Sequence, residues 1–320
     1  MTIGPAPARR FVNRASRLPD RLFTATTFLF AAILVSVLLA VAVLLTATSL
    51  MAWDRFGVVG FIAGQTWDVV NSVYGAFPFV VGTLESSLLA LAIAAPIGLM
   101  TAIFLAELAP RRVALPLTFL IELLAAIPSV VIGLWGVFVL SPFLRDTVES
   151  FIVGTFGWVP FLGGPAFGIG LFSAGVILAI MILPTIVSIS REVITAVPRS
   201  QREAMLALGA TRWETITRTV LPYARSGIIG AVILGLGRAL GETMAVTMVI
   251  GNKDAVPDRL FAQAQTIASK IATTFNEASV GLQTESLIAL GLVLLAITIV
   301  LNVVARLLVR RVTGAAPRRA

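Results

Sequence analysis

The chain has 320 residues, of which 58% are hydrophobic and only 12% are charged, with a formal net charge of +8. A soluble domain carries about a quarter charged residues, so this composition predicts an all-α, polytopic membrane protein and excludes an ordinary soluble enzyme. The sequence contains no cysteine and no histidine, which excludes disulfides, thiolate chemistry and histidine-based metal sites.

Six apolar runs follow one another along the chain, and each has the length of about 20 residues that a helix needs to cross the hydrocarbon core. They cover residues 23–49, 80–106, 118–140, 171–190, 228–250 and 287–309. The runs are too long and unbroken for barrel strands, so we expect six transmembrane helices. Pro96, Pro128 and Pro184 lie inside three of them and predict kinks or packing positions.

Most of the 24 basic residues lie in the two terminal segments and in residues 107–117 and 191–227. The positive-inside rule therefore places these segments, with both termini, in the cytoplasm, so the charge indicates topology rather than nucleic-acid binding. The predicted organisation is a cytoplasmic segment (1–22), a first transmembrane helix (23–49), an extracytoplasmic segment (50–79), a five-helix transmembrane domain (80–309) and a cytoplasmic basic tail (310–320).

Two further outer segments carry weaker signals. Residues 141–170 are rich in glycine, proline and aromatic residues, a composition compatible with a re-entrant loop, an interfacial loop or a docking surface. Residues 251–286 carry both signs of charge and a short helical pattern.

The cytoplasmic segment 191–227 predicts two short helices. Each has the Ser/Thr-x-x-Glu spacing of a capping box: Ser200 with Glu203, and Thr211 with Glu214. Gly209 is expected to end the first helix, and Leu221-Pro222 to turn the chain back towards the membrane. This is more order than a connector needs. The pattern is compatible with an amphipathic hairpin at the interface or with a docking element for a cytoplasmic partner.

This segment resembles the EAA loop of binding-protein-dependent ABC importer permeases. The residues that carry the resemblance are Glu203, Ala204, Gly209, Leu221 and Pro222. Met205 and Thr219 depart from the family pattern, where alanine and isoleucine are usual. The resemblance implies a type I importer permease fold whose short cytoplasmic helix fits a cleft on an ATPase subunit and transmits its closure.

Four stretches between residues 80 and 309 narrow the resemblance to phosphate-specific importer permeases: GTLESSLLALAIAAPIGLMTAIFLAEL, IELLAAIPSVVIGLWG, ILPTIVSISREVITAVP and GLGRALGETMAV. The long segment after the first run and the last stretch look more like the PstC-type subunit than its PstA-type partner. The resemblance implies a multi-pass subunit of the bacterial cytoplasmic membrane. Its implied partners are a PstA-type permease, two PstB-type ATPase subunits and an extracytoplasmic PstS-type phosphate-binding protein.

The sequence lacks the G-x-x-x-x-G-K-[ST] motif of a P-loop. We therefore expect no cofactor and no catalytic residue on this chain, with ATP and Mg bound by the partner ATPase subunits. Three alternatives stay open: a permease for another oxyanion such as sulfate or molybdate, an ion-coupled secondary transporter that uses Glu242 as a carboxylate relay, and a membrane scaffold.

Arg238 and Glu242 are the only charges in the fifth apolar run. Helical geometry predicts that they lie near the middle of the bilayer, one turn apart on the same face. Charges at this depth must pair with each other or face protein or water. The pair is therefore either an ion pair that locks helices together or part of an anion path, where the guanidinium fork binds phosphate and Glu242 keeps that binding weak. The resemblance favours the phosphate path.

Three other residues in the runs are candidates for support. Gly237 and Gly241 have the spacing of a small-residue face on which another helix approaches closely. Glu122, near the inner end of the third run, is a candidate for buried structural support, at the interface or paired with an arginine of 191–227.

Overall fold

The computed structural model describes residues 17–313. The chain divides into two compact units, residues 1–48 and 49–320. In the first unit the described part is a single apolar helix, α1 (Arg17–Ala47). Residues 1–16 of the predicted N-terminal segment and residues 314–320 of the predicted tail lie outside the described residues.

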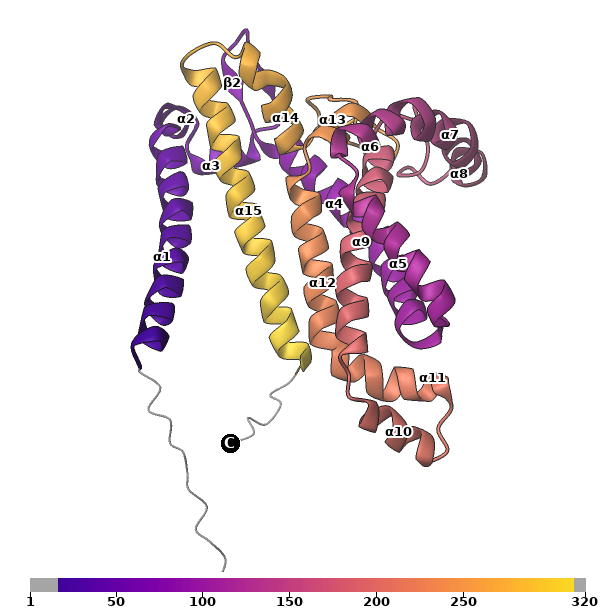
Figure 1. Ribbon diagram of the computed structural model, residues 1–320. Coiled ribbons are helices and arrows are strands. Elements are labelled where there is room, and N and C mark those ends of the chain that lie inside the picture. The colour runs from indigo at the N-terminus through magenta and orange to yellow at the C-terminus, as the bar shows by residue number, and fades with distance from the viewer. Residues whose placement is uncertain (1–16, 314–320) are drawn as a thin grey trace, which may run out of the picture. The chain divides into compact units, whose positions relative to one another are not determined.

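The second unit is a bundle built on four long helices, with shorter elements at both ends (Figure 1). The long helices are α4 (Phe77–Ile103), α9 (Leu171–Thr195), α12 (Leu221–Gly241) and α15 (Leu282–Thr313). The shorter helices are α2 (Leu50–Phe56), α3 (Val58–Ala63), α5 (Arg111–Ala126), α6 (Ser129–Trp135), α7 (Ser141–Phe143), α8 (Ser150–Phe156), α10 (Arg199–Ala207), α11 (Arg212–Thr215), α13 (Met244–Val249) and α14 (Ile267–Thr274). β1 (Trp67–Asp68) and β2 (Val73–Tyr74) pair as an antiparallel hairpin.

Five short turns of other helical types complete the described part. They are the π-helical turns η1 (Phe104–Leu108), η2 (Gly136–Leu140), η3 (Leu144–Glu149) and η4 (Ile216–Val220) and the 3₁₀ turn η5 (Phe275–Glu277). The turn η1 extends α4 as far as Leu108, and the other three π-helical turns join neighbouring α-helices into longer rods. Through η4, for example, the helix runs without interruption from Arg212 to Gly241.

Six helices of the described residues are long and apolar enough to span a membrane, which confirms the predicted number. They are Asp20–Ala47, Phe77–Leu108, Ser129–Phe156, Leu171–Thr195, Arg212–Gly241 and Leu282–Leu307. The third and fifth differ from the predicted runs 118–140 and 228–250, because the helix breaks inside each run.

The break in the third run lies at Ile127 and Pro128. Both residues have extended backbone, with ψ of 128° and 138°. A residue before proline is pushed out of the helical region by contact with the proline ring, so α5 ends and α6 begins anew. Pro128 is therefore a break rather than a kink, and part of the predicted outer segment 141–170 is helical, as far as Phe156.

The other two prolines stay inside continuous helices. α4 runs through Pro96 and α9 runs through Pro184, although each proline removes one backbone hydrogen bond. Pro184 is buried, whereas Pro96 is exposed on the surface of the unit. Their predicted role as kinks that shape the path stays a prediction.

The core lies mainly where α9 packs between α4 and α12. Leu178, Ile182 and Ile186 of α9 are fully buried there. Small residues let the helices approach: a Cβ added at Gly175 would lie 2.4 Å from the Leu89 side chain. The packing gives the unit two defined ends. α4 and α9 both finish beside α10, and α14 lies at the opposite end (Figure 1).

Candidate functional site

Arg238 lies in the last turn of α12 and reaches towards the middle of α9. Its Nη1 donates to Oγ1 of Thr185 at 3.5 Å, and its side chain is exposed on the surface of the unit. Thr185 is 14 residues beyond Leu171, about 21 Å along a helix that is about 37 Å long. Arg238 therefore lies near mid-depth of the bundle, as the sequence predicts.

Glu242 does not continue the helix that carries Arg238. α12 ends at Gly241, and Glu242 has extended backbone with φ −69° and ψ 127°. Its Oε1 accepts from the backbone N–H of Ala245, at 3.4 Å, in the first turn of α13. The prediction that the two charges share one helical face is therefore wrong, and none of the ion pairs found in residues 17–313 joins them.

The two helix breaks meet in space. α6 follows the break at Pro128, α13 follows the break at Glu242, and the two short helices pack against each other (Figure 1). Gly133 of α6 is the point of closest approach: a Cβ there would lie 2.9 Å from Cα of Ala245 and 2.7 Å from Sδ of Met248. This contact holds the backbone that carries Glu242 in place.

Gly237 and Gly241 do not form a close-approach face within the chain. A Cβ at either position would meet nothing within 4 Å. The packed glycines of α12 are Gly227, where a Cβ would lie 2.4 Å from Cγ1 of Val193, and Gly235, where it would lie 3.0 Å from Cγ1 of Ile186. The prediction is therefore corrected for this chain: Gly237 lines a small hollow with Leu301 and Asn302 of α15 without close contact, and Gly241 is exposed.

Glu122 is exposed on α5 rather than buried. It lines a hollow of about 520 Å³ near the inner end of α9, together with Ser188, Arg191 and Glu192. No arginine among the described residues lies within ion-pair distance of it. The predicted role as buried support is therefore not met within this chain, because Glu122 lies at an open hollow between α5 and α9.

The segment of residues 191–227, called the coupling segment below, keeps one of its two predicted capping boxes. Thr211 and Glu214 form the reciprocal pair: the Glu214 N–H donates to Oγ1 of Thr211, and the Thr211 N–H donates to Oε2 of Glu214 at 2.9 Å. α10 instead begins after Pro198 with no side-chain cap, so the predicted Ser200–Glu203 box is wrong. Proline at that position presets the φ angle and leaves Ser200 inside the helix.

α10 presents its EAA-type residues outwards. Glu203 and Ala204 are exposed, and Gly209 follows the end of α10 with φ +86°, a left-handed conformation that favours glycine. Leu221 and Pro222 do not turn the chain, contrary to prediction. The helix continues through them because Pro222 stands in the first turn of α12, directly after the π-helical turn η4, where its missing N–H is tolerated.

An ion pair that the sequence analysis missed anchors α10. Nη2 of Arg202 lies 2.6 Å from Oε1 of Glu107, and the two side chains are only 18% and 13% exposed. The same guanidinium donates to the carbonyl oxygens of Ile194 and Val197 at the end of α9. Glu107 lies in η1, directly after α4, and it precedes Arg202 by 95 residues. No local sequence pattern could therefore predict this ion pair.

Comparison with known protein families shows one match that covers most of the chain. The family described as binding-protein-dependent transport system inner membrane component matches residues 94–314. A curated relative, the phosphate transport system permease protein PstC of Mesorhizobium japonicum, is 47% identical over 97% of this chain and 95% of its own length. The PstC protein of Pasteurella multocida is 46% identical over 92% of both chains.

Solved structures support the same fold. A bacterial ABC transporter involved in the import of the acidic polysaccharide alginate matches with a TM-score of 0.58 at 20% identity, over 92% of this chain and all of that one. The MetNI methionine ABC transporter, in an inward-facing conformation, matches with a TM-score of 0.53 at 19% identity, over 74% of this chain and 97% of that one. At these identities the likeness describes the fold alone.

Proposed function

The chain belongs to the family of binding-protein-dependent transport system inner membrane components, and from this premise we propose that it is the PstC-type permease subunit of an ATP-driven phosphate importer. The observation that carries the proposal is the 47% identity to a phosphate transport system permease over 97% of the chain. Identity of this extent covers the membrane helices and the coupling segment together. The chain is a multi-pass inner membrane protein with a type I importer permease fold.

The surroundings of Arg238 suit an anion path. Its guanidinium is permanently charged, lies near mid-depth, and has only the Thr185 hydroxyl as a hydrogen-bond partner in the described part of the chain. It therefore keeps donors free for phosphate oxygens. Glu242 stands at the adjacent helix break and adds a negative charge that weakens anion binding enough for release. The exposed surface at Arg238 and Gly241 suits a second, PstA-type permease, which would complete the path.

α10 suits contact with an ATPase. Its exposed side includes Glu203, and the exposed Leu208 follows its last turn, while Arg202 and Glu107 fasten its other side to the membrane helices. A displacement of α10 is therefore transmitted directly to α4 and α9 through the contacts of Arg202. We place ATP and Mg on two PstB-type subunits, the α10 end in the cytoplasm with both termini, and the PstS-type binding protein at the α14 end.

Uptake measurements test this function. The chain is reconstituted in proteoliposomes with its sister permease, its ATPase and its phosphate-loaded binding protein. We expect ATP-dependent uptake of radiolabelled phosphate that excess sulfate or molybdate does not inhibit. Phosphate uptake without ATP, driven by an ion gradient, or preferential uptake of another oxyanion would reject the proposal.

A further inference from the structure

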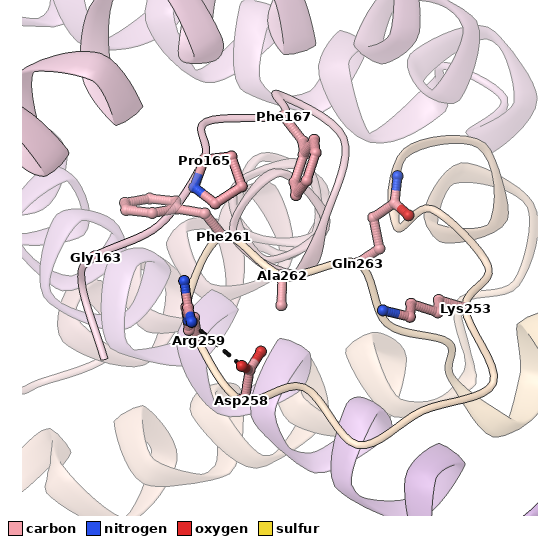
Figure 2. Close-up of a pocket in the computed structure, with 9 residues that line it drawn as sticks. All are labelled: Gly163, Pro165, Phe167, Lys253, Asp258, Arg259, Phe261, Ala262 and Gln263. Carbon is pink, nitrogen blue, oxygen red and sulfur yellow. Dashed lines mark ion pairs between the residues drawn. The ribbon is translucent and has the colours of Figure 1, made fainter. Parts of the chain in front are cut away.

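A second hollow has a volume of about 230 Å³, and Figure 2 shows the residues that line it. It lies beside the start of α9 and the end of α13, at the end of the bundle opposite α10 (Figure 1). Two segments far apart in the sequence form it: residues 163–167, which precede α9, and residues 253–263, which follow α13. Pro165, Phe167 and Phe261 supply apolar surface, and Phe167 is 49% exposed although it is a large aromatic residue. An exposed aromatic side chain at the rim of a hollow is typical of protein interfaces.

The hollow carries an excess of positive charge. Arg259 pairs with Asp258, at 3.4 Å between Nε and Oδ2, so these two charges compensate each other. Lys253 also lines the hollow, and no carboxylate in residues 17–313 lies within ion-pair distance of its ammonium group. One uncompensated cation beside aromatic surface favours an occupant that brings a carboxylate together with apolar atoms.

The walls of the hollow are held by buried polar contacts. On one side Glu149, which is 1% exposed, accepts from the backbone N–H of Gly168 at 2.9 Å and fixes the end of the 163–167 segment. On the other side Asp254, the neighbour of Lys253, pairs with the buried Lys270 at 2.6 Å. The hollow is therefore preorganised, which lowers the entropic cost of binding a partner.

The floor of the hollow is joined to the helix break that carries Glu242. The Ala264 N–H donates to the carbonyl oxygen of Ile250 at 3.1 Å, and the Gly170 N–H donates to that of Val249 at 2.9 Å. Val249 and Ile250 close α13, whose first turn is bonded to Glu242. A partner bound in the hollow would therefore act on the last residues of α13, a helix of six residues whose first turn is bonded to Glu242.

We propose that this hollow is the docking seat for a carboxylate-bearing loop of the extracytoplasmic binding protein, an inference that rests on the function proposed above. The carboxylate pairs with Lys253, and an apolar neighbour on the same loop packs against Phe167. The seat lies at the end of the molecule that the binding protein must reach, and α13 connects it with Glu242. Docking at this seat is therefore transmitted through α13 to Glu242.

The test measures the affinity of the phosphate-loaded PstS-type protein for the whole complex in lipid nanodiscs. Lys253→Glu reverses the charge in the seat and should weaken docking about tenfold and reduce its dependence on salt. Phe167→Ala should also weaken it. Arg55→Glu is the matched control, because Arg55 is an exposed cation of α2, at the same end of the bundle, that does not line the hollow. It should change the affinity less than twofold.

Normal docking to the wild-type complex together with equal affinities for Lys253→Glu and Arg55→Glu would overturn the seat and leave the proposed function standing. A wild-type complex that neither docks the protein nor transports phosphate would overturn the proposed function and the seat with it. Phosphate binding by the complex alone that is lost in Lys253→Glu would assign the hollow to the free oxyanion and overturn the docking proposal.

Discussion

The anchor of α10 offers the sharpest test of how this permease transmits force. Arg202 makes an ion pair with Glu107 and donates to two carbonyl oxygens, and both side chains are more than four-fifths buried. Replacing Arg202 by methionine keeps the apolar stem of the side chain and removes the guanidinium, so the Glu107 carboxylate loses its ion-pair partner and the carbonyl oxygens of Ile194 and Val197 lose a donor. Removing one partner of a buried pair costs about 3–5 kcal/mol, and the residual exposure here lowers that to about 2–3 kcal/mol.

The expected result is a local loosening of α10 rather than unfolding of the bundle. A loss of about 2–3 kcal/mol corresponds to backbone amide exchange in α10 that is faster by about 30- to 150-fold. Hydrogen–deuterium exchange of the purified complex, read by mass spectrometry, measures this directly. Phosphate uptake should fall while the intrinsic ATPase activity persists, because the ATPase then moves a helix that no longer pulls on α4 and α9.

Two controls make the result interpretable. Arg199→Met changes an exposed arginine of the same helix and should leave exchange in α10 unchanged. Glu107→Gln keeps an acceptor and leaves the carbonyl contacts of Arg202 intact, so its effect should be smaller than that of Arg202→Met. Unchanged exchange in Arg202→Met, or an equal effect of Arg199→Met, would refute the idea that this ion pair fastens the coupling helix.

Three further predictions follow from the site. Arg238→Gln should abolish phosphate uptake in proteoliposomes while the complex still assembles by size-exclusion chromatography, and Arg238→Lys should keep partial uptake since it keeps the charge without the fork; full uptake by the glutamine variant would contradict the anion path. Glu203→Lys should abolish co-purification of the ATPase without lowering the melting temperature of the chain, because Glu203 is exposed; a retained ATPase would argue against α10 as the contact. Gly133→Ala should destabilise the chain by about 1–3 kcal/mol, seen as a lower melting temperature, because its Cβ would press on α13, whereas Gly154→Ala, with open space around it, should not.

The local signals of the sequence were sufficient for several features. The number of membrane spans, the Thr211–Glu214 cap and the end of α10 just before Gly209 all depend on residues within one turn or one helix. The same is true of the depth of Arg238, which follows from counting along a continuous helix. Such features could be predicted because hydrophobicity and capping act over short distances in the chain.

The errors arise where one segment depends on another. The pattern around Glu242 is as helical as that around Arg238, yet the helix ends between them, where α13 packs on α6 through Gly133. The Ser200 cap failed because Pro198 already starts α10. Glu122 stands in an apolar stretch that predicts burial, but it is exposed at the hollow between α5 and α9.

The sequence by itself determined that this chain is a six-span membrane protein whose basic residues gather in a few polar segments, because apolar length and charge pattern act through the solvent and need no particular neighbours. Only the tertiary structure decided which charges meet. It separates Arg238 from Glu242 by a helix break, joins Arg202 to Glu107 across 95 residues, and brings residues 163–167 against 253–263 around Lys253. These juxtapositions depend on how α4, α9, α12 and α13 pack, and packing is a property of the assembled core rather than of any one segment.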